Sequence, residues 1–260
     1  MPPPVYFKDL EFNLPKALRE QLVELFAQMG QGALDQETVE RDVPEAQGVY
    51  QLLLDDELVY IGKTDAEAGL RKRLVRHARK IRSRLNLEPS RVTFKAVRVY
   101  VFTAMDLETL LIKYYKDEGG IDLSWNLSGF GSNDPGRRRD ETELKPGHFD
   151  KLYPINLDLQ VDLEPNPDGL TAAQVLGQIN EKVSYTIRSQ NKGGKSRKPH
   201  PDLEAATVTL PQTDNTVRNL LRRVRAALGD SWQVTALPGY VIVYKESKRY
   251  PEGEVLEPLD

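Results

Sequence analysis

The stretch that most limits the fold of this chain is GVYQLLLDDELVYIGKT, which runs from Gly48 to Thr64. Two apolar runs, rich in valine, leucine and tyrosine, flank the acidic triplet Asp55–Glu57. Such residues favour extended strands, and a short polar interruption between two such runs is typical of a tight turn. The stretch therefore predicts an antiparallel hairpin with Tyr50 on one strand and Tyr60 on the other.

The segments around this hairpin predict an α+β core, in which a small antiparallel sheet is flanked by helices. Apolar residues at helical spacing predict helices over 14–29, 66–85 and 105–120, and alternation predicts a third strand over 92–102. In the first helix, the residues expected to face inward are Leu18, Leu22, Leu25, Phe26 and Met29.

The character of the sequence changes after about Pro154, where a C-terminal α/β extension is expected. Periodicity predicts helices over 171–189 and 216–229, the latter with Thr213 or Asp214 as its N-cap. A closing hairpin is predicted within 232–245. The expected parts are an N-terminal helical arm over 1–45, the core over 46–153 and the extension over 154–260, whose role no motif identifies.

Composition excludes several classes of site. The chain of 260 residues has no cysteine, which rules out disulfides and zinc–thiolate centres. Its three histidines, His77, His148 and His200, lie far apart in the sequence, and neither His148 nor His200 is expected to act in catalysis. No apolar run approaches the roughly 18 residues of a membrane helix, and the start resembles no signal peptide, so a cytoplasmic location is expected.

Positive charge is concentrated, although the formal net charge is −3. The stretch 71–84 contains eight lysine and arginine residues, one histidine and no acid, and smaller basic clusters occupy 136–139 and 191–198. A solvated charged face explains any single cluster. Several clusters on a net-acidic chain indicate instead that a polyanion binds at defined places.

The hairpin and the elements after it carry the residue types that phosphodiester hydrolysis needs. These are an acceptor that orients water, a cation for the developing charge and a carboxylate for a metal ion. Tyr50 and Tyr60, Arg73 with His77, and Glu108 supply them. The alternative is that the tyrosines only pack across the hairpin and that the glutamate only faces solvent.

These residues resemble the GIY-YIG nuclease superfamily, with valine in place of isoleucine in the first tripeptide. The matching positions are Gly48, Val49 and Tyr50; Tyr60, Ile61 and Gly62, followed by Lys63; Arg73 and His77 in LRKRLVRH; Glu108 in DLETLLIKYY; and Asn126 in SWNLSGFG. Within the superfamily, the segment WNLSGFGSNDPGRRR is most similar to type II restriction endonucleases. The resemblance covers roughly residues 45 to 150.

The resemblance implies a role for each site residue. Tyr50 would accept the proton of the attacking water and Tyr60 would share the water network, although which tyrosine is the base stays open. Lys63 would favour the phenolate, and Arg73 would bind the phosphate oxygens. Glu108 would bind one Mg²⁺ or Mn²⁺ ion per active site.

Two further residues belong to the implied site. His77 would position the nucleophile or contact the phosphate. Asn126 would support the tyrosine pair or the metal region, with turn formation as the alternative.

The resemblance also implies partners. The enzymes of this branch are homodimers that cut palindromic, GC-rich double-stranded DNA, in defence against foreign DNA. The helix over 14–29 is the candidate dimer contact, and a cognate DNA methyltransferase acting on the same site is left open. The residues expected to contact DNA are Arg71, Lys72, Arg76, Arg79, Arg137, Arg138, Arg139, Lys192, Lys195, Arg197 and Lys198.

Two other functions stay open. One is a repair or mobile-element nuclease that recognises DNA structure, and the other is a non-catalytic DNA-binding module on a nuclease scaffold. Discrete plasmid fragments would favour the restriction enzyme over the first. Trp125 and Trp232 are expected in the core rather than as stacking platforms for bases.

Overall fold

The structure is a computed structural model of the whole chain, and it describes residues 6, 11–65, 67–100, 106–126, 128–131, 140–164, 169–193, 196–210 and 214–259. The fold is mixed α+β. The chain separates into two compact units: an N-terminal unit, Met1–Leu74 with Val92–Leu123, and a C-terminal unit, Val75–Arg91 with Ser124–Asp260.

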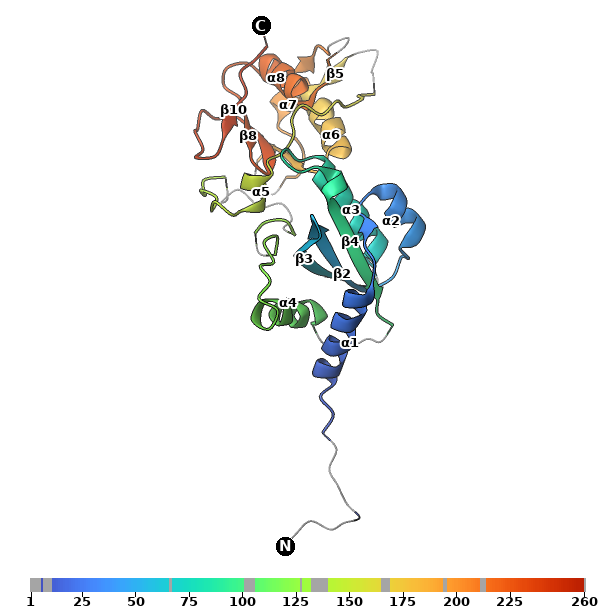
Figure 1. The fold of residues 1–260 in the computed structure, drawn as a ribbon. Helices are drawn as coiled ribbons and strands as arrows, with labels where there is room; N and C mark the ends of the chain where they lie inside the picture. The colour runs from blue at the N-terminus through green and yellow to red at the C-terminus, as the bar shows by residue number, and fades with distance from the viewer. Residues whose placement is uncertain are drawn as a thin grey trace. The chain divides into compact units, whose positions relative to one another are not determined.

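The N-terminal unit contains a four-stranded antiparallel sheet in the order β1-β4-β2-β3, in which β3 is an edge strand (Figure 1). Its strands are β1 (Gly32–Ala33), β2 (Gly48–Leu54), β3 (Glu57–Thr64) and β4 (Val92–Arg98). Its helices are α1 (Leu14–Gln28), α2 (Gln36–Asp42), the first part of α3 (Leu70–Arg82) and α4 (Leu107–Asp117).

The predicted hairpin is confirmed. Strands β2 and β3 pair antiparallel, with Tyr50 opposite Gly62, and the turn between them consists of Asp55 and Asp56. Both turn residues have positive φ, 51° and 69°. A two-residue turn with two positive φ angles matches the right-handed twist of paired strands, and aspartate tolerates this conformation better than most residues.

The two faces of the hairpin have different neighbours. Val49 and Ile61 face a core that contains Leu22 and Phe26 of α1 and Leu111 of α4. Because side chains alternate along a strand, the tyrosines turn to the opposite face. This alternation places them on the side of the sheet where α3 begins.

Two expectations for the helices are wrong in detail. Leu25, expected to face inward, is 46% exposed, because the α1 face in the core is a narrow one centred on Leu22 and Phe26. Helix α3 begins at Leu70 rather than at residue 66, because Gly69 has φ of +64° and interrupts the helical backbone.

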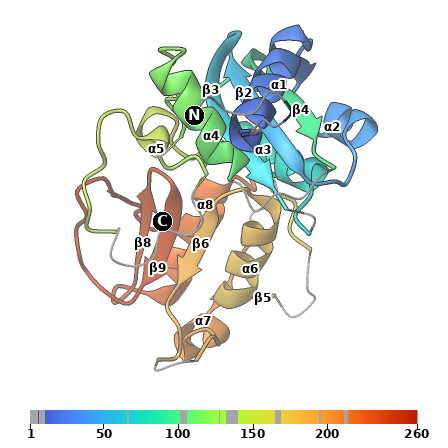
Figure 2. The ribbon, with the colours of Figure 1, turned by 90° about the horizontal axis from the view of Figure 1, so that it is seen from below.

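The C-terminal unit contains a second four-stranded sheet in the order β10-β8-β9-β6, with β6 parallel to β9 and the other pairs antiparallel. Figure 2 shows β8, β9 and β6 of this sheet. Its strands are β5 (Leu170–Thr171), β6 (Thr186–Ser189), β7 (Thr207–Val208), β8 (Gln233–Leu237), β9 (Tyr240–Tyr244) and β10 (Glu254–Val255), with β5 and β7 forming a separate pair. Besides the end of α3, its helices are the 3₁₀ helix η1 (Pro89–Arg91), α5 (Phe149–Leu152), α6 (Ala172–Lys182), α7 (Pro201–Ala205) and α8 (Val217–Leu228).

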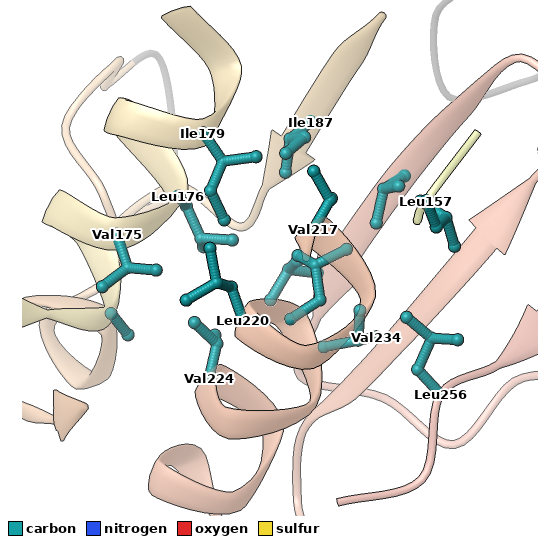
Figure 3. Packing of buried hydrophobic residues seen from close by; sticks show 14 of the residues in the cluster. Leu157, Val175, Leu176, Ile179, Ile187, Val217, Leu220, Val224, Val234 and Leu256 are labelled. Carbon is teal, nitrogen blue, oxygen red and sulfur yellow. The ribbon is translucent and has the colours of Figure 1, made fainter. Parts of the chain in front are cut away.

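The core of this unit forms between α6, α8 and one face of the sheet. Figure 3 shows Leu176 and Ile179 of α6 near Leu220 of α8, with Ile187 of β6 and Val234 of β8 on the sheet side. Leu220, Ile179 and Val234 are fully buried. This large apolar cluster gives the extension its own hydrophobic core.

The helix predicted over 171–189 is wrong in its second half. Helix α6 ends at Lys182, and Val183 is already extended, with φ −97° and ψ 162°. Residues 186–189 form β6 instead, paired with β9. The β-branched Thr186 and Ile187 favour a strand, and an available edge of β9 overrides the helical periodicity.

The start of α8 is also corrected. Thr216 is the N-cap, since its side chain accepts a hydrogen bond from the backbone of Asn219 at 3.3 Å. Asp214 accepts from the backbone N–H of Thr216 at 3.3 Å, and Thr213 lies outside the described residues. The closing hairpin predicted within 232–245 is confirmed as β8 and β9.

The limits of the compact units differ from the expected parts, because the segment after α3 pairs with the C-terminal chain. Arg84 forms an antiparallel bridge with Ile155, and the backbone N–H of Leu85 donates to the carbonyl of Pro154 at 2.8 Å.

Among the helices that the structure describes, none is long and apolar enough to cross a membrane.

Candidate active site

The two tyrosines of the hairpin form a coupled pair. Their ring centroids are 6.1 Å apart, and the Tyr50 hydroxyl donates a hydrogen bond to the Tyr60 hydroxyl. Tyr50 is only 1% exposed, whereas Tyr60 is half-buried. Tyr60 is therefore the member of the pair with access to solvent.

Both glycines of the two tripeptides make room for close approaches. A Cβ at Gly62 would lie 2.4 Å from both Cζ and Oη of Tyr50. A Cβ at Gly48 would lie 2.2 Å from the carbonyl oxygen of Val97 on β4 and 2.8 Å from Leu70 of α3. Gly62 thus leaves space for the phenol, and Gly48 lets β4 and α3 approach the strand that carries it.

Arg73 brings positive charge to the tyrosine pair from the first turn of α3. Burial raises the pKa of Tyr50, Tyr60 and Glu108, and the positive charge of Arg73 partly offsets this rise in all three groups. The Nε atom of Arg73 is buried and has no hydrogen-bond partner within the described part of the chain. A buried donor of this kind is suited to an anionic ligand.

Glu108 comes to the same place from the first turn of α4. Its Oε2 accepts a hydrogen bond from the backbone N–H of Lys63 at 3.2 Å. Since β3 is an edge strand, this N–H is available to a side chain rather than to another strand. The half-buried carboxylate is thereby attached to the strand that carries Tyr60.

Burial is the main influence on the ionisation of the site. It raises the pKa of Tyr50 well above 10 and raises the pKa of Tyr60, against the lowering by Arg73. Burial, followed by the charge of Asp106, also raises the pKa of Glu108. Both phenols are therefore neutral near pH 7 before any ligand binds.

Lys63 lies at this site, but its ammonium group pairs with the carboxylate of Asp106 rather than acting on the phenols as expected. Its ammonium group pairs with Asp106 at 2.9 Å, and this contact raises the pKa of the lysine. The charged side chains that act on the phenols are Arg73 and Glu108. The structure therefore connects Lys63 with the acidic residues of α4.

The remaining two site residues belong to the C-terminal unit. His77 is 4% exposed, and its ring stacks on Phe130 with centroids 4.7 Å apart. Asn126 is half-buried, next to the buried Trp125. The residues that the structure brings together are thus Tyr50, Tyr60, Lys63, Arg73 and Glu108.

Part of the basic stretch 71–84 is internal. Arg71 Nε donates to the carbonyl of Val43 at 2.7 Å. Arg84 is buried and pairs with Asp150 at 2.9 Å. Lys80 donates to the carbonyl of Phe130, and burial, followed by the charge of Arg84, lowers its pKa to about 8. These side chains hold the fold, and this use of basic residues is visible only in three dimensions.

Several of the basic residues that were expected to contact DNA are exposed. Lys72, Arg76 and Arg79 are exposed on α3. Lys192, Arg197 and Lys198 are exposed on a loop in which the backbone N–H of Lys192 donates to the carbonyl of Lys198 at 3.0 Å. Arg137, Arg138, Arg139 and Lys195 lie outside the described residues.

The arginines of α8 have intramolecular partners. Arg222 and Arg223 donate to backbone carbonyls, at 3.0 Å to Glu257 and 3.3 Å to Thr209. Arg225 donates to the carbonyl of Gly229 at 2.6 Å. This basic helix therefore stabilises the extension.

Both tryptophans lie in the core, as expected. Trp125 packs against Phe130, Phe149 and Tyr153, and Trp232 is 1% exposed and donates to Asp202 at 3.1 Å. His148 and His200 cap helices α5 and α7.

Sequence reasoning missed Asp106. Its side chain accepts hydrogen bonds from the backbone and the hydroxyl of Thr109, at 3.3 Å and 2.8 Å, and pairs with Lys63. The signal was the pattern of an aspartate three residues before a threonine, at the predicted start of a helix.

A divalent cation fits the donor set at Glu108. Within the described ranges, no group of three histidine or acidic side chains forms a metal site by itself. Mg²⁺ prefers oxygen ligands and commonly keeps several waters, with only one or two carboxylates from the protein. One half-buried carboxylate close to an arginine is therefore compatible with Mg²⁺ or Mn²⁺ completed by water and a substrate phosphate.

No protein-family model matches this chain, and no curated protein sequence matches it.

Proposed function

We propose that this chain is a metal-dependent endonuclease of the GIY-YIG type that hydrolyses phosphodiester bonds in double-stranded DNA. One observation carries the proposal. The rings of Tyr50 and Tyr60 lie 6.1 Å apart, and Glu108 is hydrogen-bonded at 3.2 Å to the strand that carries Tyr60. The charge of Arg73 acts on all three of these groups. The antiparallel sheet with α3 and α4 beside its hairpin supports assignment of the N-terminal unit to a GIY-YIG core.

The two tyrosines have different roles in this proposal. Tyr60 is the half-buried member of the pair. It would first lose its own proton to solvent, and the resulting phenolate would then orient the attacking water and take up its proton. Tyr50 is buried and hydrogen-bonds Tyr60, so it acts as a positioning residue. Burial raises the pKa of Tyr60, and the hydrogen bond with Tyr50 partly offsets that rise. The positive charge of Arg73 assists both proton transfer and phosphate binding.

Arg73 would stabilise the transition state. Negative charge builds on the non-bridging phosphate oxygens as the water attacks. A guanidinium with a buried, unsatisfied Nε–H is prepared to donate to those oxygens without first losing a protein partner.

Glu108 is the residue that would hold the divalent cation. When bound there, Mg²⁺ or Mn²⁺ would neutralise charge on the scissile phosphate and on the leaving oxygen. The hydrogen bond from Lys63 fixes one carboxylate oxygen, so the direction of the side chain is set before the ion binds.

We further propose that the enzyme is a type II restriction endonuclease that acts as a homodimer in the cytoplasm. A palindromic site cut on both strands needs two active sites related by two-fold symmetry. Leu14 and Leu25 of α1 are 41% and 46% exposed, which supports α1 as the contact between copies. A cognate methyltransferase would act on the same site. Gel filtration at monomer mass, with and without DNA, would count against the dimer.

The proposal is tested by incubating the purified full chain with a supercoiled plasmid and Mg²⁺, with EDTA as the control. Discrete fragments with reproducible ends, absent with EDTA, are the expected result. Cutting confined to branched or damaged DNA would favour a structure-specific repair nuclease. Binding without cutting, under all metal conditions, would leave a non-catalytic DNA-binding module.

A further inference from the structure

Lys63 contacts the first turn of α4 twice. Its backbone N–H donates to Glu108 at 3.2 Å, and its ammonium group pairs with Asp106 at 2.9 Å. One residue of β3 therefore holds both the carboxylate of the candidate site and the residue two positions before it.

Asp106 connects this contact to the helix itself. As the N-cap of α4, it accepts from the backbone N–H of Thr109 through Oδ1 and from the Thr109 hydroxyl through Oδ2. An N-cap fixes the first helical turn, where free N–H groups otherwise lack partners. Glu108 lies in that turn, so its direction depends on how Asp106 is held.

The ion pair contributes little to stability. The side chains of Lys63 and Asp106 are 49% and 52% exposed, and exposed pairs typically stabilise a protein by less than about 1 kcal/mol. Its consequence is geometric, because it joins the start of α4 to the edge of the sheet. Displacement of a catalytic group by about 1 Å can lower a rate by about two orders of magnitude.

We propose that Asp106 is a positioning residue, which acts through Lys63 and the first turn of α4 to hold Glu108 in the orientation that binds a divalent cation. The inference rests on the proposed function of Glu108. It assigns Lys63 to the carboxylate side of the site rather than to the phenols.

The alternative is that Asp106 only caps α4, and the chain contains a matched control for that role. Asp35 caps α2 with the same arrangement, accepting from the backbone N–H and the hydroxyl of Thr38 at 2.8 Å and 2.9 Å. Asparagine caps helices about as well as aspartate, so Asp35→Asn and Asp106→Asn both keep a cap. Only Asp106→Asn removes an ion pair with a residue that contacts Glu108.

The experiment compares three forms of the full chain: the wild type, Asp106→Asn and Asp35→Asn. Their affinity for Mn²⁺ is measured by titration, with the paramagnetic relaxation of water protons as the signal. Their activity is measured by plasmid cleavage. For Asp106→Asn we expect about tenfold weaker Mn²⁺ binding and a similar loss of cleavage, as is typical of residues that orient metal ligands. Asp35→Asn should match the wild type in both measurements. Equal Mn²⁺ affinity in all three proteins would overturn the proposal.

A double mutant separates positioning from general loss of charge. Lys63→Gln should weaken Mn²⁺ binding as Asp106→Asn does, and the double substitution should be no worse than either single one, because the two residues act as a unit. Additive losses would contradict this coupling. If the wild type binds Mn²⁺ but cuts no DNA, the nuclease function fails while the titration still decides the role of Asp106.

Discussion

The phenol of Tyr50 lies directly over Gly62 on the neighbouring strand, where an added Cβ would come within 2.4 Å of the hydroxyl oxygen. This close approach lets the Tyr50 hydroxyl reach the Tyr60 hydroxyl and form a hydrogen bond with it. It explains in physical terms why a tyrosine on one strand needs a glycine opposite it on the next.

Replacement of Gly62 by alanine should therefore move the Tyr50 hydroxyl. We expect plasmid cleavage to fall at least about tenfold, with a loss of unfolding free energy of about 1–3 kcal/mol, the usual effect of overpacking. Gly177→Ala is the control, because nothing lies within 4 Å of its Cβ position in α6 and alanine favours a helix. Unchanged cleavage by Gly62→Ala would contradict the assigned packing.

The tyrosines should differ when each is replaced by phenylalanine. Tyr60→Phe removes the hydroxyl that would contact water, so single-turnover cleavage should fall by about two orders of magnitude or more. Tyr50→Phe should lose less. Although burial mainly sets the pKa of Tyr60, loss of the hydrogen bond from Tyr50 raises it further, so the rise of the rate with pH should move to higher pH. A larger loss in Tyr50→Phe than in Tyr60→Phe would reverse the roles proposed for the two hydroxyls.

Replacement of two arginines of the basic stretch should affect different properties, stability for Arg84 and DNA binding for Arg79. Arg84→Met removes the buried Arg84–Asp150 ion pair and leaves the carboxylate with only His148, 3.8 Å away. We therefore expect a loss of about 3–5 kcal/mol of unfolding free energy, measured by urea denaturation. Arg79→Met, at an exposed position, should change stability by less than about 0.5 kcal/mol. It should instead weaken DNA binding and reduce the salt dependence of that binding. Equal stabilities of the two variants would refute the structural role of Arg84.

The stability contributed by Lys80 should depend on pH. Its pKa is about 8 in the folded protein, mainly because of burial, and 10.5 for an ordinary lysine. Between these values the unfolded chain binds more protons, so the stability of the wild type relative to Lys80→Met should increase as the pH rises from about 8 to 10.5. The increase is at most about 1.4 kcal/mol per pH unit. A constant difference over this range would show that the ammonium group is not buried.

The sequence predicted the elements that depend on neighbouring residues. The hairpin followed from two strand-forming runs around Asp55 and Asp56, and the start of α4 is specified by Asp106 and Thr109. The prediction was wrong where a distant segment supplied a pairing partner. Residues 186–189 were predicted to be helical from their local sequence, but they form a strand that pairs with β9.

The candidate site was predictable in its residue types but not in its contacts. Tyr60 and Glu108 were identified from the sequence, whereas the bond between the Lys63 backbone and Glu108 needs α4 to reach the open edge of the sheet. Similarly, a run of basic residues does not reveal which of its members are buried. Arg84 and Lys80 turn inward because of aromatic and acidic partners far along the chain, among them Phe130 and Asp150.

The most direct test of the central claim is the cleavage of plasmid DNA by Glu108→Gln, compared with the wild type and with Glu181→Gln at an exposed position of α6. Glutamine keeps the shape of the side chain and the acceptor for the Lys63 N–H but removes the charge that would bind a cation. We predict that Glu108→Gln binds DNA within a few-fold of the wild type and cuts it at no measurable rate with Mg²⁺, while Glu181→Gln cuts normally. Cleavage by Glu108→Gln at the wild-type rate would contradict the account.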